Sequence, residues 1–435
     1  MRKQVGALYA LAIAAVSCSE STPRVTAPDN PIASIDVMSP PASLYVGETF
    51  QLKAIPRASS GGEPSVAPLS WRSSNNSIAT VSQGLVTARS LGSVDVFAEA
   101  GGVTGTTRVV VVEPEFILSP DRYADGTIGF TGTRNRTGFD LFVVGPSGIQ
   151  RVTSSAANEQ FDGWSPDGAN MALIRFPVDS AIFTSHVVPA AGGDTRLIAD
   201  GIVNWAPDWL HRGSIADGRI LISDHDGSRS HPIGPSAPGA LLFGPWWSRD
   251  GKRVAFAHSS STQVPADLYI ANADGSGLVN LTNTTNLSEE YASWSPDGAY
   301  LAFTAHNDPA GIGNSVFTIR SNGTELTRLT QKVTPVGDLD PQWSPDGTRI
   351  VFTTRTASRY TIHIVNAAGG GTMRMTPSLE VSGFPVWSSD GTRIAFTVLS
   401  PQTLDQDIYV MTADRRMLIQ LTSGTGHNFG PFWRP

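Results

Sequence analysis

The sequence predicts an all-β protein in which a small β-sandwich is followed by a β-propeller. The 435 residues include 43 Gly and 30 Pro spread along the chain, a composition typical of many short strands joined by turns. Residues 34–113 show about seven short strands with alternating apolar and polar residues. From about residue 120 onward, a tryptophan-centred motif recurs at spacings of 38 to 49 residues, which is the period of propeller blades.

The charge of the chain excludes one class of partner. The sequence has 31 Lys and Arg residues against 38 Asp and Glu residues, a formal net charge of -7. Such a chain lacks the excess positive charge with which proteins displace counterions from the phosphate backbone of a nucleic acid. We therefore expect no nucleic-acid partner.

The first seventeen residues predict an export signal. Arg2 and Lys3 precede an apolar run over residues 5–16, which is too short to span a bilayer and typical of a signal peptide. The run ends on Ala15-Val16-Ser17-Cys18, which resembles a bacterial lipoprotein signal. This resemblance implies that residues 1–17 are removed and that Cys18 is lipidated. Because Ser19 follows, it also implies an outer-membrane anchor that faces the periplasm or the cell surface. The alternative is an ordinary signal peptide cut nearby.

Cys18 is the only cysteine of the chain, so no intrachain disulfide can form. Residues 18–33 are rich in Ser, Thr and Pro without apolar periodicity, which predicts an extended tether after the lipid.

Residues 34–114 predict the β-sandwich. Its signals include the turn Val46-Gly47-Glu48-Thr49, a stretch that begins at Trp71, and the turn glycine Gly84. The whole segment resembles the bacterial immunoglobulin-like domain of group 2, which implies an immunoglobulin-like fold. We expect Trp71 to fill the core rather than to bind a ligand.

Residues 120–435 carry the repeat Trp-Ser-Pro-Asp-Gly or a close variant of it. The proline presets the backbone of a hairpin, the Asp bonds its own backbone, and the Gly adopts a left-handed conformation. These Asp residues are therefore predicted to be structural. The repeat tryptophans are Trp164, Trp247, Trp294, Trp343 and Trp387, with weaker copies assigned to Trp209 and Trp433.

The ends of the repeat region predict the number of blades. Each blade reads as four strands, a to d, with the tryptophan at the end of strand a. Residues 125–153 supply strands b, c and d of one blade, and residues 428–433 supply a strand a with no blade after it. The terminal strands should pair and close a ring of seven blades. Six blades are the alternative, if the unit at Trp209 folds into its neighbour.

The repeats resemble those of the TolB family of periplasmic proteins over residues 120–435. The resemblance implies the propeller fold and, by analogy, binding of a protein or peptide. The peptide-binding residues of that family do not map onto this sequence.

The loops that precede strand a carry most of the candidate binding residues. Because strand a lines the central channel, we expect these side chains to ring the mouth of the channel. Such an acidic collar would attract a cation or a basic peptide. The alternative is a solvated polar rim. The collar consists of Glu159, Gln160, Glu289, Glu290, Asp338, Asp340, His427 and Asn428.

Enzyme signatures are absent from the sequence: it has no G-x-S-x-G elbow, no H-E-x-x-H motif and no phosphate-binding loop. We therefore predict a non-enzymatic envelope lipoprotein without a cofactor, which binds an envelope protein or peptide through one face of the propeller. The alternative is a carbohydrate-binding protein or a metal-dependent polysaccharide lyase. A metal site of that kind would use His258, His306 or His427, although no spacing enforces it.

Overall fold

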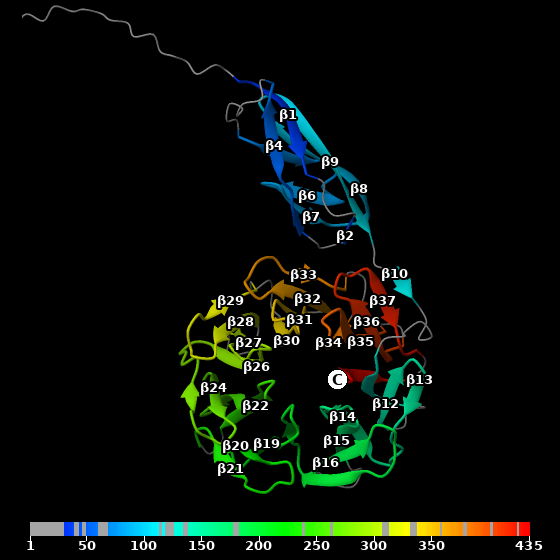
Figure 1. Cartoon of the computed structure of the whole chain (residues 1–435), viewed down its shortest axis with the longest axis vertical. Helices are drawn as coiled ribbons and strands as arrows, with labels where there is room; N and C mark the ends of the chain where they lie inside the picture. The colour runs from blue at the N-terminus through cyan, green and yellow to red at the C-terminus, as the bar shows by residue number, and fades with distance from the viewer. Residues whose placement is uncertain are drawn as a thin grey trace, which may run out of the picture.

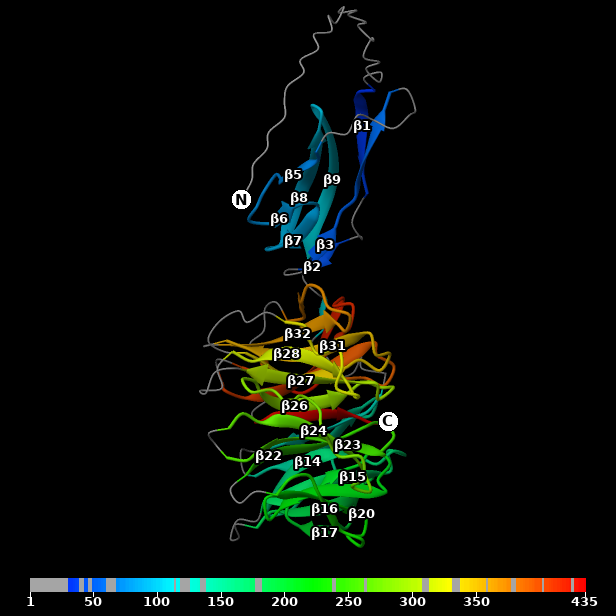
Figure 2. The same cartoon turned by 90° about the vertical axis from the view of Figure 1, so that its left-hand side faces the viewer.

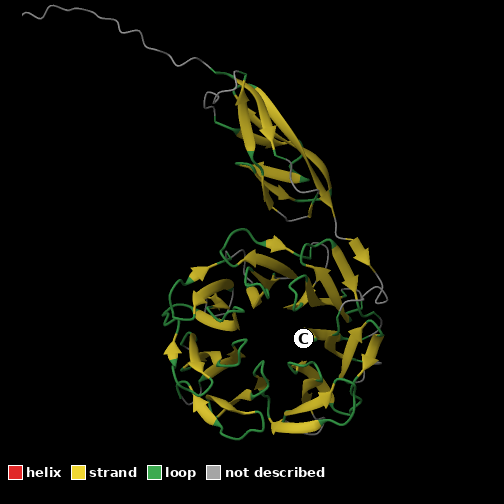
Figure 3. Ribbon diagram, viewed as in Figure 1, coloured by secondary structure: helices red, strands yellow, loops and turns green. Residues whose placement is uncertain are grey.

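The computed structural model describes residues 30–38, 43–45, 49–59, 68–112, 115–117, 126–133, 138–176, 182–236, 240–261, 264–306, 313–330, 337–356, 359–376, 381–400, 403–423 and 426–435. These residues form strands joined by turns, and none of them is in an α-helix (Figure 3). Among them, no helix is long and apolar enough to cross a membrane. The all-β class is confirmed. The predicted signal peptide, Cys18 and residues 18–29 of the tether lie outside the described residues.

The first domain packs a four-stranded sheet, β2-β9-β8-β5, against a three-stranded sheet, β3-β7-β6, with the pair β1-β4 beside them. Its core contains Leu44, Val86, Val96 and Val109, and Trp71 packs against this cluster as expected. Side chains of β8 alternate between buried and less buried, because one face of the sheet covers the core. The strands are β1 (Ile32–Val37), β2 (Leu44–Tyr45), β3 (Thr49–Gln51), β4 (Ala54–Ala58), β5 (Ser70–Ser73), β6 (Ala79–Ser82), β7 (Leu85–Ala88), β8 (Gly92–Ala100) and β9 (Val103–Val112).

The described part of residues 115–435 forms seven sheets, which we number as blades 1 to 7. Figure 1 shows them arranged in a ring around a central space. In blades 1 to 3, strands a to d are β38 (Asn428–Trp433), β11 (Ile128–Gly132), β12 (Asp140–Gly145) and β13 (Gly148–Arg151); β14 (Asn158–Trp164), β15 (Asn170–Phe176), β16 (Thr184–Pro189) and β17 (Arg196–Asp200); and β18 (Asn204–Trp205), β19 (His211–Ala216), β20 (Arg219–Asp224) and β21 (His231–Ile233).

Blades 4 to 7 follow in chain order, and their strands a lie nearest the centre of the ring (Figure 1). Their strands are β22 (Leu241–Trp247), β23 (Arg253–Ser259), β24 (Asp267–Asn272) and β25 (Val279–Asn280); β26 (Ser288–Trp294), β27 (Tyr300–His306), β28 (Ser315–Arg320) and β29 (Thr327–Arg328); β30 (Asp338–Trp343), β31 (Arg349–Arg355), β32 (Tyr360–Asn366) and β33 (Met373–Arg374); and β34 (Val381–Trp387), β35 (Arg393–Leu399), β36 (Gln406–Thr412) and β37 (Met417–Gln420).

Two pairings join segments that are far apart in the sequence. The C-terminal strand β38 pairs antiparallel with β11, so blade 1 takes its strand a from the end of the chain. The linker strand β10 (Glu115–Ile117) pairs parallel with β37 and adds a fifth strand to the outer edge of blade 7. This short strand lies between the two domains predicted from the sequence, and no sequence signal indicated it.

The two ends of the propeller differ. We call the end where strands a begin, and where the d-to-a and b-to-c loops emerge, the loop face. The opposite end, with the Ser-Pro-Asp-Gly hairpins, is the hairpin face. The chain ends there, two residues after Trp433, and Figure 2 places the C-terminus at one flat end of the ring.

The hairpins have the structural role that the sequence predicts. In the hairpin after β30, the Ser344 hydroxyl donates to Asp346 and accepts the backbone N–H of Arg349. The Asp346 carboxylate also accepts the N–H of Thr348, and these bonds lower its pKa to about 2. The same bonds recur at Ser165, Ser248, Ser295 and Ser388.

The repeat tryptophans connect neighbouring blades. The indole N–H of Trp294 donates to the backbone carbonyl of Trp246 in blade 4, at 3.0 Å. That carbonyl belongs to the residue just before the tryptophan of the preceding blade, Trp247. The same bond runs from Trp164 to Phe432, from Trp247 to Asn204, from Trp343 to Ser293, from Trp387 to Gln342 and from Trp433 to Val386.

The assignment of Trp209 as a repeat tryptophan is wrong. Trp205 is the equivalent residue, because it pairs with Arg212 seven residues later, as Trp164 pairs with Met171. Residues 205–209 thus read Trp-Ala-Pro-Asp-Trp, and Trp209 occupies the hairpin position that other blades give to glycine. Its φ of 55° is close to the 64° of Gly168. The unit forms its own sheet, β18 to β21, rather than part of a neighbour.

Candidate functional site

Three carboxylates of the predicted collar are buried and do not ring the channel mouth. Glu159 and Glu289 have 0% of their surface exposed, and Asp338 has 7%. Each lies five residues before the repeat tryptophan, at the start of strand a. Their side chains turn away from the channel toward neighbouring strands, so the expectation that these three residues form an accessible collar is wrong.

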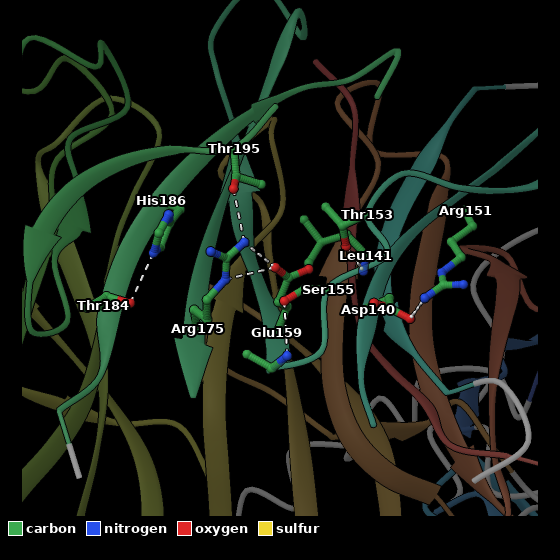
Figure 4. Close-up of polar contacts among 11 residues, drawn as sticks. Asp140, Leu141, Arg151, Thr153, Ser155, Glu159, Arg175, Thr184, His186 and Thr195 are labelled. Atoms are coloured by element: carbon green, nitrogen blue, oxygen red, sulfur yellow. Dashed lines mark hydrogen bonds and ion pairs between the residues drawn. The ribbon is translucent and has the colours of Figure 1, made fainter. Parts of the chain in front are cut away.

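Glu159 is held by a charged partner. The Arg175 guanidinium donates two hydrogen bonds to one oxygen of this carboxylate, at 2.7 and 3.0 Å, and a third bond to the Thr195 hydroxyl. Figure 4 shows Arg175 lying between Glu159 and Thr195. The pair joins β14 to β15 within blade 2 and leaves Glu159 no free face for a ligand.

Glu289 and Asp338 join successive blades through a threonine. The Thr282 hydroxyl, which follows strand d of blade 4, accepts the N–H of Leu268 and donates to Glu289 in strand a of blade 5. Thr330 makes the equivalent bonds between Val316 and Asp338. The recurring Leu-Thr at the end of strand d, six to eight residues before the carboxylate, was the sequence signal for this structural role.

Burial raises the pKa of Glu289 to about 8, and the nearby charge of Asp267 adds to the rise. Between about pH 4.5 and 8, the Glu289 carboxyl is therefore protonated in the folded protein and ionised in the unfolded chain. Because the pKa of Glu289 is higher in the folded state than in the unfolded chain, its contribution to the free energy of unfolding is fully present below pH 4.5 and is lost as the pH rises toward 8.

We expect Glu289→Gln to reduce this dependence. Between pH 5 and 8, the unfolding free energy of the parent should fall relative to that of the variant, by at most about 1.4 kcal/mol per pH unit. Urea unfolding at several pH values measures the difference, with the exposed Asp194→Asn as the control. Equal slopes in the parent and the Gln variant would contradict the raised pKa.

The remaining collar residues differ in environment. Gln160 is exposed, and Glu290 and Asp340 are partly exposed. Asn428 donates to Asp407 at 3.3 Å, and His427 uses its backbone N–H to bond Thr133. Of the predicted carboxylates, the structure thus leaves Glu290 and Asp340 accessible.

Glu290 and Asp340 lie beside Tyr291. Burial, and then the charges of Asp340 and Glu290, raise the pKa of the Tyr291 phenol. Burial also raises the pKa of Asp340. The three groups come from the strands a of blades 5 and 6, which are neighbours around the channel.

A bulge in strand a turns side chains into the channel. Tyr291, Asp340 and Phe384, each three residues before the repeat tryptophan, have φ values of 50°, 52° and 60°. Gly244 and Gly430 occupy this position in blades 4 and 1, also with positive φ. A left-handed conformation is unfavourable for bulky residues and clusters at functional sites.

Tyr291 is 42% exposed and Phe384 is 53% exposed although both belong to the innermost strands, so their free surface faces the channel. Neither aromatic residue was among the binding residues predicted from the sequence. Their common position relative to the repeat tryptophan was the signal that could have found them.

Exposed apolar residues gather at the same end of the propeller. Phe183 accepts a backbone bond from Gly201, which brings the b-to-c loop of blade 2 next to the segment that leads into blade 3. Large exposed apolar groups near a channel mark interaction surfaces. The exposed apolar residues of the described loop face are Ile182, Phe183, Ile202, Leu241, Val264 and Leu404.

The histidines of the alternative metal site do not converge. The His258 ring is buried against the edge of Tyr269, and burial lowers its pKa. His306 lies 3.8 Å from Glu290. Among the described residues, no group of three or more His, Cys, Asp or Glu side chains has the geometry to hold a metal ion.

Comparisons with known proteins match both domains. A family described as the TolB beta propeller domain matches residues 210–400, and a family described as bacterial Ig-like domain (group 2) matches residues 31–111. An uncharacterized protein of Agrobacterium fabrum is 31% identical over 267 residues, which cover 57% of this chain and 88% of that protein. These matches confirm both domain resemblances stated from the sequence.

Other similar proteins include enzymes. Dipeptidyl-peptidase 5 of Trichophyton equinum is 31% identical over 177 residues, which are 37% of this chain and 24% of that protein. This chain therefore spans about a quarter of the peptidase. The structure of an oligogalacturonate lyase from Vibrio parahaemolyticus is 10% identical, with a TM-score of 0.52 over 69% of this chain and 86% of that chain. At this identity the likeness concerns the fold alone.

Proposed function

We propose that this chain, which belongs to the TolB beta propeller domain family and carries an N-terminal bacterial Ig-like domain, is a non-enzymatic binding protein of the cell envelope. It holds a segment of another protein at the loop face of its propeller. The observation that carries the proposal is the channel cluster, defined as Glu290, Tyr291, Asp340 and Phe384. Its members are accessible side chains on rigid innermost strands, and three of them adopt strained backbone conformations.

The chemistry of the channel cluster fits a segment with both basic and apolar side chains. The carboxylates of Glu290 and Asp340 lie near enough to the Tyr291 phenol to raise its pKa, so a Lys or Arg side chain bound at the ring would also be attracted by these charges. Phe384 and the exposed apolar residues of the loop face offer contacts for aliphatic or aromatic side chains. Neither the carboxylates nor the apolar residues need a cofactor to make these contacts.

The export signal and the lipidation of Cys18 that the sequence predicts support an envelope location for this activity. In this arrangement the tether and the Ig-like domain act as a spacer between the membrane and the propeller. No reaction is part of the proposal, because the channel cluster has no nucleophile paired with a base.

Site-specific cross-linking tests the proposed binding. A photoreactive phenylalanine at Phe384 in the full-length lipoprotein, expressed in its native cells, should capture a defined protein. The same group at Ile149, an exposed residue on the outer strand β13, serves as the control position. Mass spectrometry should locate the cross-link in a segment with basic side chains.

The double change Glu290→Gln and Asp340→Asn should weaken capture about tenfold, on the order of 1.4 kcal/mol, because it removes both negative charges. Asp194→Asn, an exposed carboxylate outside the channel, should leave capture unchanged. Equal capture from Phe384 and Ile149, or capture unaffected by the double change, would contradict the proposal.

A further inference from the structure

A cavity lies at the hairpin end of the channel. It has a volume of about 430 Å³, within the size range of small-molecule sites. Blades 2 to 6 form its wall, through the ends of their strands a and, in blades 3 and 4, the hairpins that follow. Six of its lining residues are tryptophans: Trp164, Trp205, Trp209, Trp246, Trp247 and Trp294.

Four of these tryptophans are explained by the repeat, and two are not. Trp164, Trp205, Trp247 and Trp294 stand at the repeat position, and three of them donate the bonds that join blades. Trp246 stands one residue before the repeat tryptophan, where blades 2, 3, 5 and 6 have Gly163, Asn204, Ser293 and Gln342. Trp209 replaces a hairpin glycine. The repeat itself requires neither Trp209 nor Trp246, although Trp246 also packs against the core of blades 4 and 5.

The backbone of Trp209 has a conformation that is unfavourable for a bulky residue. Its φ of 55° lies in the left-handed region, and the five equivalent hairpins place glycine there at 64° to 70°. Its ring stacks on Trp205, with centroids 4.9 Å apart and planes at 20°. A bulky residue held in an unfavourable conformation points to a functional role for the side chain.

Polar residues also line the cavity. They are Asn204, Gln342, Ser293 and Asp162, and the Ser293 hydroxyl itself is buried. Burial raises the pKa of Asp162 to about 6. Arg249 carries a positive charge at the rim, so the lining holds one acidic and one basic group.

From this combination we propose that the hairpin-end cavity binds a pyranose ring of a neutral glycan. The C–H face of a sugar ring packs on an indole, and its ring of hydroxyls both donates and accepts hydrogen bonds. The amides of Asn204 and Gln342 and the carboxyl of Asp162 can donate to and accept from these sugar hydroxyls. A quaternary ammonium ligand would not use the two amides, and an acidic sugar would need more than one basic group.

This glycan site shares no residue with the channel cluster, although Ala292 and Gln342 of its wall lie one and two residues after Tyr291 and Asp340 on the same strands. The channel cluster lies toward the loop face, whereas Trp209 and Trp246 lie at the ends of strands a and in the hairpins. Each site therefore supplies the control variant for the other.

Intrinsic tryptophan fluorescence and calorimetry of the purified chain test the inference. The probes are glucose, galactose, mannose and N-acetylglucosamine, with their di- and trisaccharides. Two variants take residues that other blades have at the same position: Trp209→Gly restores the hairpin glycine, and Trp246→Ser copies Ser293. Because both residues already occur in the repeat, we expect both variants to fold.

The expected result is saturable binding of at least one neutral sugar. Each variant should weaken that binding tenfold or more, and the pair Glu290→Gln and Asp340→Asn should leave it unchanged. The inference is overturned if none of the neutral sugars saturates, or if both tryptophan variants bind as the parent does. It is also overturned if only choline or only galacturonate binds. None of these results depends on whether a protein is captured at Phe384.

Discussion

Replacing Arg175 by Met is expected to destabilise the propeller by about 3 kcal/mol, because it leaves the fully buried carboxylate of Glu159 without its charged partner. The second oxygen of Glu159 already lacks a hydrogen-bond partner in the described structure. The variant would therefore contain a buried charge that neither water nor a neighbouring donor compensates. Urea unfolding followed by tryptophan fluorescence measures the loss.

Nine of the ten tryptophans belong to the propeller and one, Trp71, to the Ig-like domain, so the fluorescence signal reports mainly on the propeller. The matched control is the double change Glu159→Leu and Arg175→Met, which removes both charges. We expect the double variant to be more stable than Arg175→Met alone, because replacing a buried ion pair by apolar residues of similar volume is often close to neutral.

The same double variant separates structure from binding. If Glu159 belonged to a ligand-binding collar, its loss would weaken protein capture at Phe384. We expect capture to persist, because the Glu159 side chain is fully buried and hydrogen-bonded to Arg175 of its own blade. If the double variant folded stably but lost capture, Glu159 would have to be part of the binding site.

The fold was predictable because its signals are local. A Ser-x-Asp-Gly hairpin forms the same turn at each of its five occurrences, three of them Ser-Pro-Asp-Gly, and five copies at blade spacing define a propeller without knowledge of the contacts. Trp209 was misassigned for the same reason. With a tryptophan at the glycine position, the hairpin no longer matches its own signature, and the nearby Trp205 lacks the following serine.

The binding residues were only partly predictable because aligned positions do not define the side of a strand. Neighbouring residues of a strand point to opposite faces, so Glu289 and Glu290 cannot both face the channel. The bulge between Glu290 and Ser293 then inserts an extra residue and turns Tyr291 inward. Aligning carboxylates by their distance from the tryptophan therefore combined buried structural groups with channel groups.

A second large effect is expected at Trp294, which is 7% exposed and packs within the core between blades 4 and 5. Trp294→Ala should destabilise the propeller by about 3–5 kcal/mol, because it leaves a large cavity in a packed core. It also removes the cation–π contact with Arg253, whose guanidinium carbon lies 4.6 Å from the ring centroid. The midpoint of urea unfolding is the measurement.

Trp294→Phe isolates the bond between the blades. It keeps an aromatic ring in the core but removes the N–H that donates to the Trp246 carbonyl, so we expect a loss of about 1–3 kcal/mol. Trp387→Phe is the matched control, because the same bond to Gln342 is longer, at 3.3 Å, and more exposed to water. If the repeat tryptophans stabilise the ring through these bonds, the change at Trp294 must cost more than the change at Trp387. Equal losses would mean that ring packing alone explains why the tryptophan recurs.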